Sequence, residues 1–82
     1  MNLDNFELIR KIKGLTQVEA TEILMVSKIS YLRCVVRKEN RLKKQHTLNE
    51  ARTIAKILDV NVNALYDHNL IDKINQLLKG TP

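Results

Sequence analysis

Two copies of one helix-start signal constrain the fold of this chain more than any other feature. They are Thr16-Gln17-Val18-Glu19 and Thr47-Leu48-Asn49-Glu50. In such a capping box the threonine hydroxyl accepts from the amide three residues later, and the glutamate carboxylate accepts from the threonine amide. The chain has only two glycines and one proline, which is too few for the many turns of a β-sandwich. The sequence therefore predicts an all-α protein.

Apolar residues recur at helical spacing around these two signals. The helical segments expected from this pattern are 3–13, 17–24, one from residue 28 onward, one behind Thr47, a short one over 62–66 and a last one over 69–79. Only Met25 and Val26 lie between the second segment and Ser27, which is a typical helix cap. Two short helices joined by a turn of about three or four residues have the outline of a helix-turn-helix.

Length and composition limit what else the chain can be. Its 82 residues predict one small domain over 1–82, without room for a catalytic domain beside a regulatory one. No set of nucleophile, base and orienting group is recognisable, so we do not expect an enzyme. One cysteine, Cys34, and two dispersed histidines offer no metal-ligand spacing. We therefore expect no metal or cofactor, a core position for Cys34, and a cytoplasmic protein without a membrane segment.

The positive charge is concentrated in one part of the chain. The net charge is +5, but the segment 27–46 alone carries seven basic residues against Glu39, which gives it a net charge of +6. The rest of the chain has seven basic and eight acidic residues and is almost neutral. Such a block is typical of a surface that binds a polyanion, with nucleic acid as the first expectation. The alternative at this point is a charged face that only contacts water.

Several stretches of the sequence resemble the Cro/phage-repressor (Xre-like) helix-turn-helix family. They are Gly14-Leu15-Thr16-Gln17, Val26-Ser27, Ser30-Tyr31 with Arg33, and Ile54-Ala55-Lys56-Ile57-Leu58-Asp59-Val60-Asn61 with Leu65-Tyr66. The resemblance covers about residues 6–66 and implies a compact five-helix fold that binds double-stranded DNA, usually as a homodimer. The helix-turn-helix motif would span about residues 16–37. The helix over 69–79 would be an extra C-terminal amphipathic element.

The resemblance also implies roles for individual side chains. The third helix would enter the major groove, which would make the protein a sequence-specific transcriptional regulator of a bacterium, phage or mobile element. The residues expected to read base edges are Lys28, Ile29, Ser30 and Arg33. The residues expected to contact phosphates, from the family positions and the basic block together, are Gln17, Ser27, Arg10, Arg37, Lys38, Arg41, Lys43 and Lys44.

Three departures from the family pattern lie around the third helix. Met25 replaces the turn glycine, so either a methionine is left-handed there, at a cost of about 1 kcal/mol, or the second helix runs longer. Val35 replaces the acidic residue that pairs with the first-helix arginine, which leaves Arg10 without that partner. The segment 36–49 is longer than the usual loop and has no glycine or proline. It either extends the third helix or forms a DNA-facing arm.

Apolar residues on two sides of the third helix lead to a second hypothesis. Tyr31, Cys34 and Val35 share one face of that helix, and a second face is formed by Ile29, Leu32 and Val36. A second apolar face predicts that a loop or a partner covers it. The residues expected in a dimer or partner interface are Leu32, Val36, Ile71, Ile74 and Leu78. The alternative function is a protein-interaction module on the same fold, such as an antirepressor, a modulator or an antitoxin that binds another regulatory protein.

Overall fold

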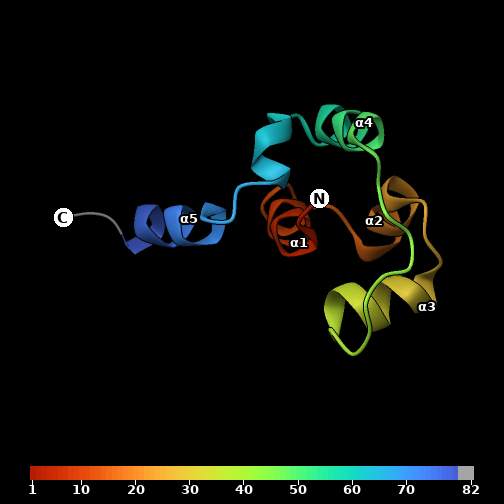
Figure 1. Ribbon diagram of the computed structural model, residues 1–82. Coiled ribbons are helices and arrows are strands. Elements are labelled where there is room, and N and C mark those ends of the chain that lie inside the picture. Colours follow the sequence, from red (N-terminus) through yellow and green to blue (C-terminus); the bar gives the residue numbers. More distant parts are fainter. Residues whose placement is uncertain (80–82) are drawn as a thin grey trace.

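The computed structural model describes residues 1–79, and this part of the chain is all-helical and compact (Figure 1). Its α-helices are α1 (Leu3–Ile12), α2 (Gln17–Leu24), α3 (Lys28–Tyr31), α4 (Leu48–Leu58) and α5 (Leu70–Lys79). A π-helical turn, Leu32–Val36, continues α3, and a 3₁₀ turn, Val62–Leu65, lies between α4 and α5. No strand occurs within the described residues. The all-α prediction is confirmed, and the helix ends that the sequence defined are correct to within one residue.

Polar side chains cap the starts of the helical elements. The residues that accept from backbone amides in this way are Asn2, Thr16, Ser27, Thr47 and Asn61. Both predicted capping boxes are complete, because Glu19 Oε1 accepts from Thr16 N at 2.9 Å and Glu50 Oε1 accepts from Thr47 N at 3.0 Å. These bonds satisfy amides that have no partner within the helix. The starts of these five elements are therefore encoded by residues next to them in the sequence.

Left-handed residues end the helices. The residues with positive φ are Gly14 (73°), Met25 (57°), Lys38 (57°) and Asp59 (56°). After Gly14, Met25 and Asp59, the next amide donates to the carbonyl five residues earlier, at 3.0–3.1 Å, which is the Schellman pattern. A side chain in this conformation costs about 1–2 kcal/mol relative to glycine. The alternative that the second helix runs longer is wrong, because α2 ends at Leu24 and Met25 turns the chain.

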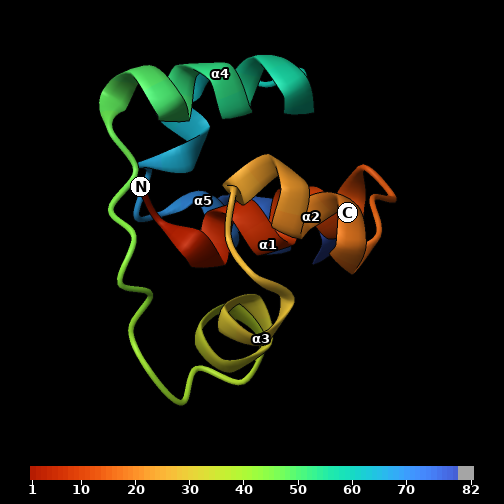
Figure 2. The ribbon, with the colours of Figure 1, turned by 90° about the vertical axis from the view of Figure 1, so that its right-hand side faces the viewer.

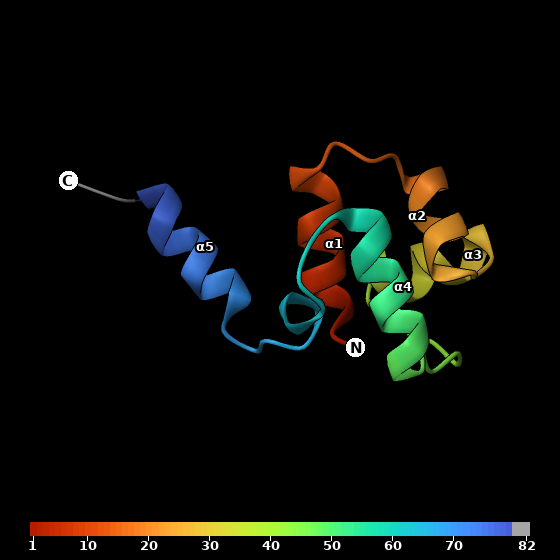
Figure 3. The same ribbon diagram turned by 90° about the horizontal axis from the view of Figure 1, so that it is seen from above.

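The core lies where α1, α2, α4 and the α3–π helix meet (Figure 3). Its buried apolar residues are Phe6, Ile9, Ala20, Leu24, Tyr31, Val35, Ala51, Ile54, Ala55, Leu58 and Leu65. Helix α1 packs against the π turn, the 3₁₀ turn and α5, while α2 packs against α3 and α4. Because α1 and α2 hold one side of α3, its opposite side is left at the surface.

A buried amide connects α1 to the segment before α5. Asn5 Nδ2 donates to the carbonyl oxygens of Ala64, at 2.9 Å, and Asp67, at 2.7 Å. These bonds attach α1 to the segment that leads into α5. The Asn5 Oδ1 atom is buried and has no hydrogen-bond partner among the described residues. Asn5 therefore acts through its two donors.

Helix α5 extends away from the other helices (Figures 1 and 3). The molecule measures 42 × 26 × 21 Å along its principal axes. Leu70 at the start of α5 packs against the core, but Leu77 near its end is 77% exposed. The helix predicted over 69–79 is confirmed as α5, and its apolar face is only partly covered. No helix in residues 1–79 has the length and apolar character needed to cross a membrane.

Candidate nucleic-acid interface

The first turn of α3 is organised by two serines. Ser27 Oγ accepts from Ser30 N at 3.1 Å, which confirms Ser27 as the cap, and the Ser27 hydroxyl lies 3.0 Å from Ser30 Oγ and donates to it. Ser27 is exposed and Ser30 is half-buried. Each hydroxyl can turn its proton outward and also accept, so the contacts of Ser27 with phosphate and of Ser30 with bases stay predictions.

The two predicted apolar faces of the α3–π helix differ in burial. Tyr31 and Val35 are buried in the core, as expected. Leu32 is half-buried and packs against the same core, whereas Ile29 is 65% exposed and Val36 is 39% exposed. The chain itself therefore covers part of the second face. Ile29 and Val36 remain accessible on different turns of the helix.

A buried polar network holds the inner face of α3 against α1. The Tyr31 hydroxyl donates to Glu7 Oε1 at 2.5 Å, and Arg10 Nε donates to the same oxygen. Arg10 Nη1 also donates to Leu15 O at 2.7 Å. Burial, reinforced by the hydrogen bond to the ionised Glu7, raises the pKa of Tyr31. The hydrogen bond to Glu7 also raises the pKa of Arg10.

The structure argues against the predicted phosphate contact of Arg10. Arg10 is only 8% exposed, and Glu7 and Leu15 O occupy its guanidinium group. With Val35 in place of an acidic residue, Arg10 was expected to lack a partner. Glu7, three residues before Arg10 on α1, takes that place. Carboxylate and guanidinium groups at this spacing lie on one helix face. Arg10 thus connects α1 to Leu15, in the loop that leads into α2.

The segment after the π turn forms an extended strip that we call the basic arm, residues 37–46 (Figure 2). Because the helix ends at Val36, the alternative that the basic block extends the third helix is wrong. The first part of the arm is attached to the body at two points. Glu39 N donates to Arg33 O at 2.8 Å, and Lys38 Nζ lies 3.2 Å from Asp4 Oδ1.

The second part of the basic arm is attached to α2 and α4. His46 Nε2 lies 2.8 Å from Leu24 O, and Lys44 Nζ lies 3.0 Å from Glu50 Oε2. The amide of Thr47 and the ammonium group of Lys44 together lower the pKa of Glu50 to about 2. The arm is therefore held at both ends. Between these ends the side chains of Arg41 and Lys43 are exposed.

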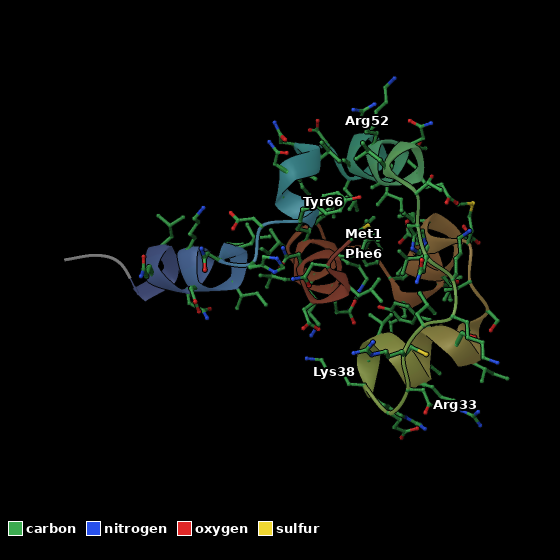
Figure 4. The ribbon with its side chains drawn as sticks, viewed as in Figure 1. Met1, Phe6, Arg33, Lys38, Arg52 and Tyr66 are labelled. Carbon is green, nitrogen blue, oxygen red and sulfur yellow. The ribbon has the colours of Figure 1, made fainter. Side chains whose placement is uncertain are left out.

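A groove of about 770 Å³ separates α3 from the basic arm. The predicted contact residues that line it are Ser27, Ile29, Ser30, Arg33, Arg41, Lys43 and Lys44. Figure 4 shows Arg33 pointing outward from the π turn that continues α3. None of the described residues that line this groove is acidic. The groove therefore combines hydroxyl, methyl and cationic groups with no opposing negative charge.

The other predicted DNA contacts lie outside this groove. Gln17, at the start of α2, and Lys28, at the start of α3, are exposed. Lys38 points toward the α1 side (Figure 4), where it pairs with Asp4. Arg37 Nη1 lies 4.0 Å from Glu39 Oε1. Exposed pairs of this kind are weak, so they leave Arg37 and Lys38 accessible to a stronger anion.

The predicted interface residues are only partly brought together. A second, smaller groove of about 320 Å³ on another flank of the α3–π helix is lined by Leu8, Val36 and Ile71, among others. Val36 and Ile71, which are 35 positions apart in the sequence, therefore line one groove, together with charged residues such as Asp4 and Lys11 of α1. Ile74 is half-buried on α5, and Leu32 packs inward. Leu78 lies outside the residues whose side chains the structure describes.

Comparisons of the chain with protein-family models, curated proteins and solved structures found no match. Within residues 1–79 no three His, Cys, Asp or Glu side chains are grouped so that they could hold a metal ion. The groove between α3 and the basic arm is therefore the basis on which a function is assigned.

Proposed function

We propose that the protein is a sequence-specific regulator of transcription that binds double-stranded DNA. In this proposal α2, the left-handed turn at Met25 and α3 form a helix-turn-helix of the Cro/phage-repressor type, and α3 enters the major groove. The observation that supports it most directly is the groove of about 770 Å³, which is lined by Ser30 of α3, Arg33 of the π turn, and Arg41 and Lys43 of the basic arm.

The chemistry of this groove fits duplex DNA. The guanidinium group of Arg33 can donate two parallel hydrogen bonds to guanine, and Ile29 offers methyl groups to thymine. Arg41, Lys43 and Lys44 supply the cations that neutralise phosphates. An anionic membrane is a poorer partner, because the basic arm is not an amphipathic helix.

The proposal extends to the setting in which such a regulator acts. A regulator of a bacterium, phage or mobile element works in the cytoplasm, where the single thiol of Cys34 stays reduced. As a homodimer it would place two α3 helices about 34 Å apart, over the half-sites of a near-palindromic operator.

Selection of duplexes from a random pool tests this function, with fluorescence anisotropy on the selected site. We expect enrichment of a defined site and binding that weakens steeply with salt. If about four to six cations contact phosphate, log K falls with log salt at a slope of about −4 to −5 per subunit. Failure to retain any duplex at low salt contradicts the proposal, as does an affinity that salt does not change.

A protein-interaction module on the same fold is the second candidate, with an antirepressor, a modulator or an antitoxin as examples. It is favoured by exposed apolar residues at the proposed DNA-binding surface, where Met25 is 55% and Ile29 is 65% exposed. A partner regulator bound there would cover α3. Gel shift and pull-down with the same purified protein distinguish the candidates, because tight partner capture without DNA retention supports only the second.

A further inference from the structure

A residue from the basic arm forms a hydrogen bond to the last carbonyl group of α2. The last carbonyl groups of a helix have no partner within the helix. The amides of Met25 and Val26 fold back onto two carbonyls of the last turn of α2. The carbonyl of Leu24 is reached instead by His46, whose Nε2 lies 2.8 Å away. A carbonyl only accepts, so the ring carries its proton on Nε2 and His46 is the donor.

The basic arm touches the body at a few points rather than along its length. The groove of about 770 Å³ lies on one side of it, and a second hollow of about 650 Å³ lies on the other. Leu42 lines both hollows and is half-buried. The positions of Arg41 and Lys43 therefore depend on Leu42 and on the attachments at the two ends of the arm.

His46 is the side chain that joins the second part of the arm to α2 of the proposed helix-turn-helix, whereas the first part is joined to the π turn by the backbone bond from Glu39 N to Arg33 O. The partner of His46, Leu24, is the last residue of α2 and directly precedes the left-handed turn at Met25. The other side-chain attachments lead elsewhere, since Lys38 pairs with α1 and Lys44 pairs with α4. The arm and the turn before α3 are thus connected by one hydrogen bond across 22 positions.

We propose that His46 is a positioning residue, which holds the basic arm beside α3 so that Arg41 and Lys43 meet the DNA that α3 approaches. This inference rests on the proposed function, but the hydrogen bond is a property of the free protein. An arm that is already placed loses little conformational freedom on binding, whereas an untethered arm must first be ordered. His46 thereby increases DNA affinity without contacting DNA.

The first test uses the free protein and ¹⁵N relaxation of the arm amides. In the wild type, residues 40–44 are expected to have order parameters near those of the helices, about 0.8 or higher. In His46→Ala they are expected to fall to about 0.6 or lower. Gln45→Ala changes the neighbouring exposed residue and serves as the matched control, with wild-type values expected. Unchanged order in His46→Ala overturns the proposal.

The second test measures affinity for the selected DNA site as a function of salt. His46→Ala is expected to bind about tenfold more weakly, with a salt slope shallower by about two because two phosphate contacts are lost. His46→Gln, which keeps a donor that can reach the carbonyl, recovers part of both. The double variant Arg41→Ala/Lys43→Ala gives a similar loss, and adding His46→Ala to it has little further effect.

A purely structural role for His46 gives a different result. It lowers the urea midpoint of His46→Ala but leaves the salt slope of the folded protein at the wild-type value, and that result overturns the positioning role alone. A wild-type protein that binds no DNA overturns both the positioning role and the proposed function. The relaxation data then still show whether His46 orders the arm, so the two failures are distinguishable.

Discussion

The inner and outer faces of the α3–π helix differ in burial and in the bonds that their polar side chains make. On the inner face Tyr31 is fully buried and its hydroxyl is bonded to Glu7. On the outer face Ile29 is exposed, and Arg33 makes no ion pair within the described residues. On the inner face, the hydrogen bond and the buried ring hold the helix against α1. On the outer face, the side chains are exposed and can contact another molecule.

This difference means that stability and binding depend on different residues of one helix. A change on the inner face alters the free energy of unfolding, while a change on the outer face alters what the helix contacts. Surface substitutions usually change stability by no more than about 0.5 kcal/mol. Substitutions on the two faces therefore test the comparison directly.

The largest effect is expected for Tyr31→Ala. Removing a buried aromatic side chain costs about 3–5 kcal/mol, and the change also removes the hydroxyl that donates to Glu7. Urea unfolding followed by circular dichroism measures this loss. The matched variant on the outer face is Arg33→Ala, for which we expect wild-type stability to within about 0.5 kcal/mol. Similar losses in the two variants would remove the distinction between the faces.

Tyr31→Phe separates the hydroxyl from the ring. It keeps the packing but removes a hydrogen bond to a charged group, for which we expect a loss of about 1–3 kcal/mol. Arg10 still pairs with Glu7 in this variant, so the carboxylate keeps one partner. Wild-type stability of Tyr31→Phe in the same urea experiment contradicts a stabilising role for the network.

The second effect is expected for DNA binding by Arg33→Ala. Loss of a two-bond contact to a base weakens binding to the selected site by about 1–3 kcal/mol. Binding to unrelated duplexes changes much less, because phosphate contacts dominate there. The matched control is Arg52→Ala, which removes an exposed arginine from α4, on the opposite side of the molecule from α3 (Figure 4). An equal effect of both variants in anisotropy titrations contradicts base reading by Arg33.

The sequence predicted most of the fold because its helix boundaries are local. Thr16 and Thr47 meet their capping partners three residues later, and Gly14 ends α1 through its own left-handed conformation. The buried face of α4 follows from spacing alone, as Ile54 and Leu58 show. No long-range contact is needed to recognise any of these features.

The site was predicted less completely because its contacts are long-range. The partners of Arg10 were not predicted, because Leu15 O and the Glu7 oxygen that Tyr31 also binds from another helix hold its guanidinium group. Glu7 was missed as its partner, although the spacing of the two residues along α1 is a usable signal. His46 had no signal in the sequence, because its partner is a backbone carbonyl 22 positions away. The groove itself depends on the position of the arm, which these contacts determine.

The third prediction concerns Met25, which turns the chain between α2 and α3. A left-handed residue other than glycine costs about 1–2 kcal/mol, and glycine adds about 0.4–1 kcal/mol of unfolded-state entropy. Met25→Gly is therefore expected to stabilise the protein by roughly 0.5–1 kcal/mol in urea unfolding. Gly14→Ala is the reciprocal variant, because nothing lies within 4 Å of an added Cβ there but its φ is +73°. It is expected to be destabilising. Destabilisation by Met25→Gly shows instead that the exposed methionine side chain stabilises the turn.

The smallest effect is a pH dependence that compares the two capping boxes. The pKa of Glu50 is lowered to about 2, first by the Thr47 amide and then by Lys44 of the basic arm. A carboxylate whose pKa is depressed on folding stabilises the protein above its ordinary pKa of 4.5, and this contribution is lost as the pH falls from 4.5 toward 2. The stability difference between wild type and Glu50→Gln should therefore be full at pH 7 and shrink over this range.

Glu19→Gln is the matched variant, because Glu19 caps α2 in the same way but has no lysine partner among the causes of its lowered pKa. Its stability difference should follow pH in the same direction and be smaller than that of Glu50→Gln. Raising the salt concentration should bring the two variants closer together, because salt screens the exposed Lys44–Glu50 pair. Equal pH dependence at low salt would show that Lys44 adds nothing to the cap. The Lys44–Glu50 pair would then not count as an attachment of the arm. His46 and Leu42 would remain to hold the arm on its side of the groove.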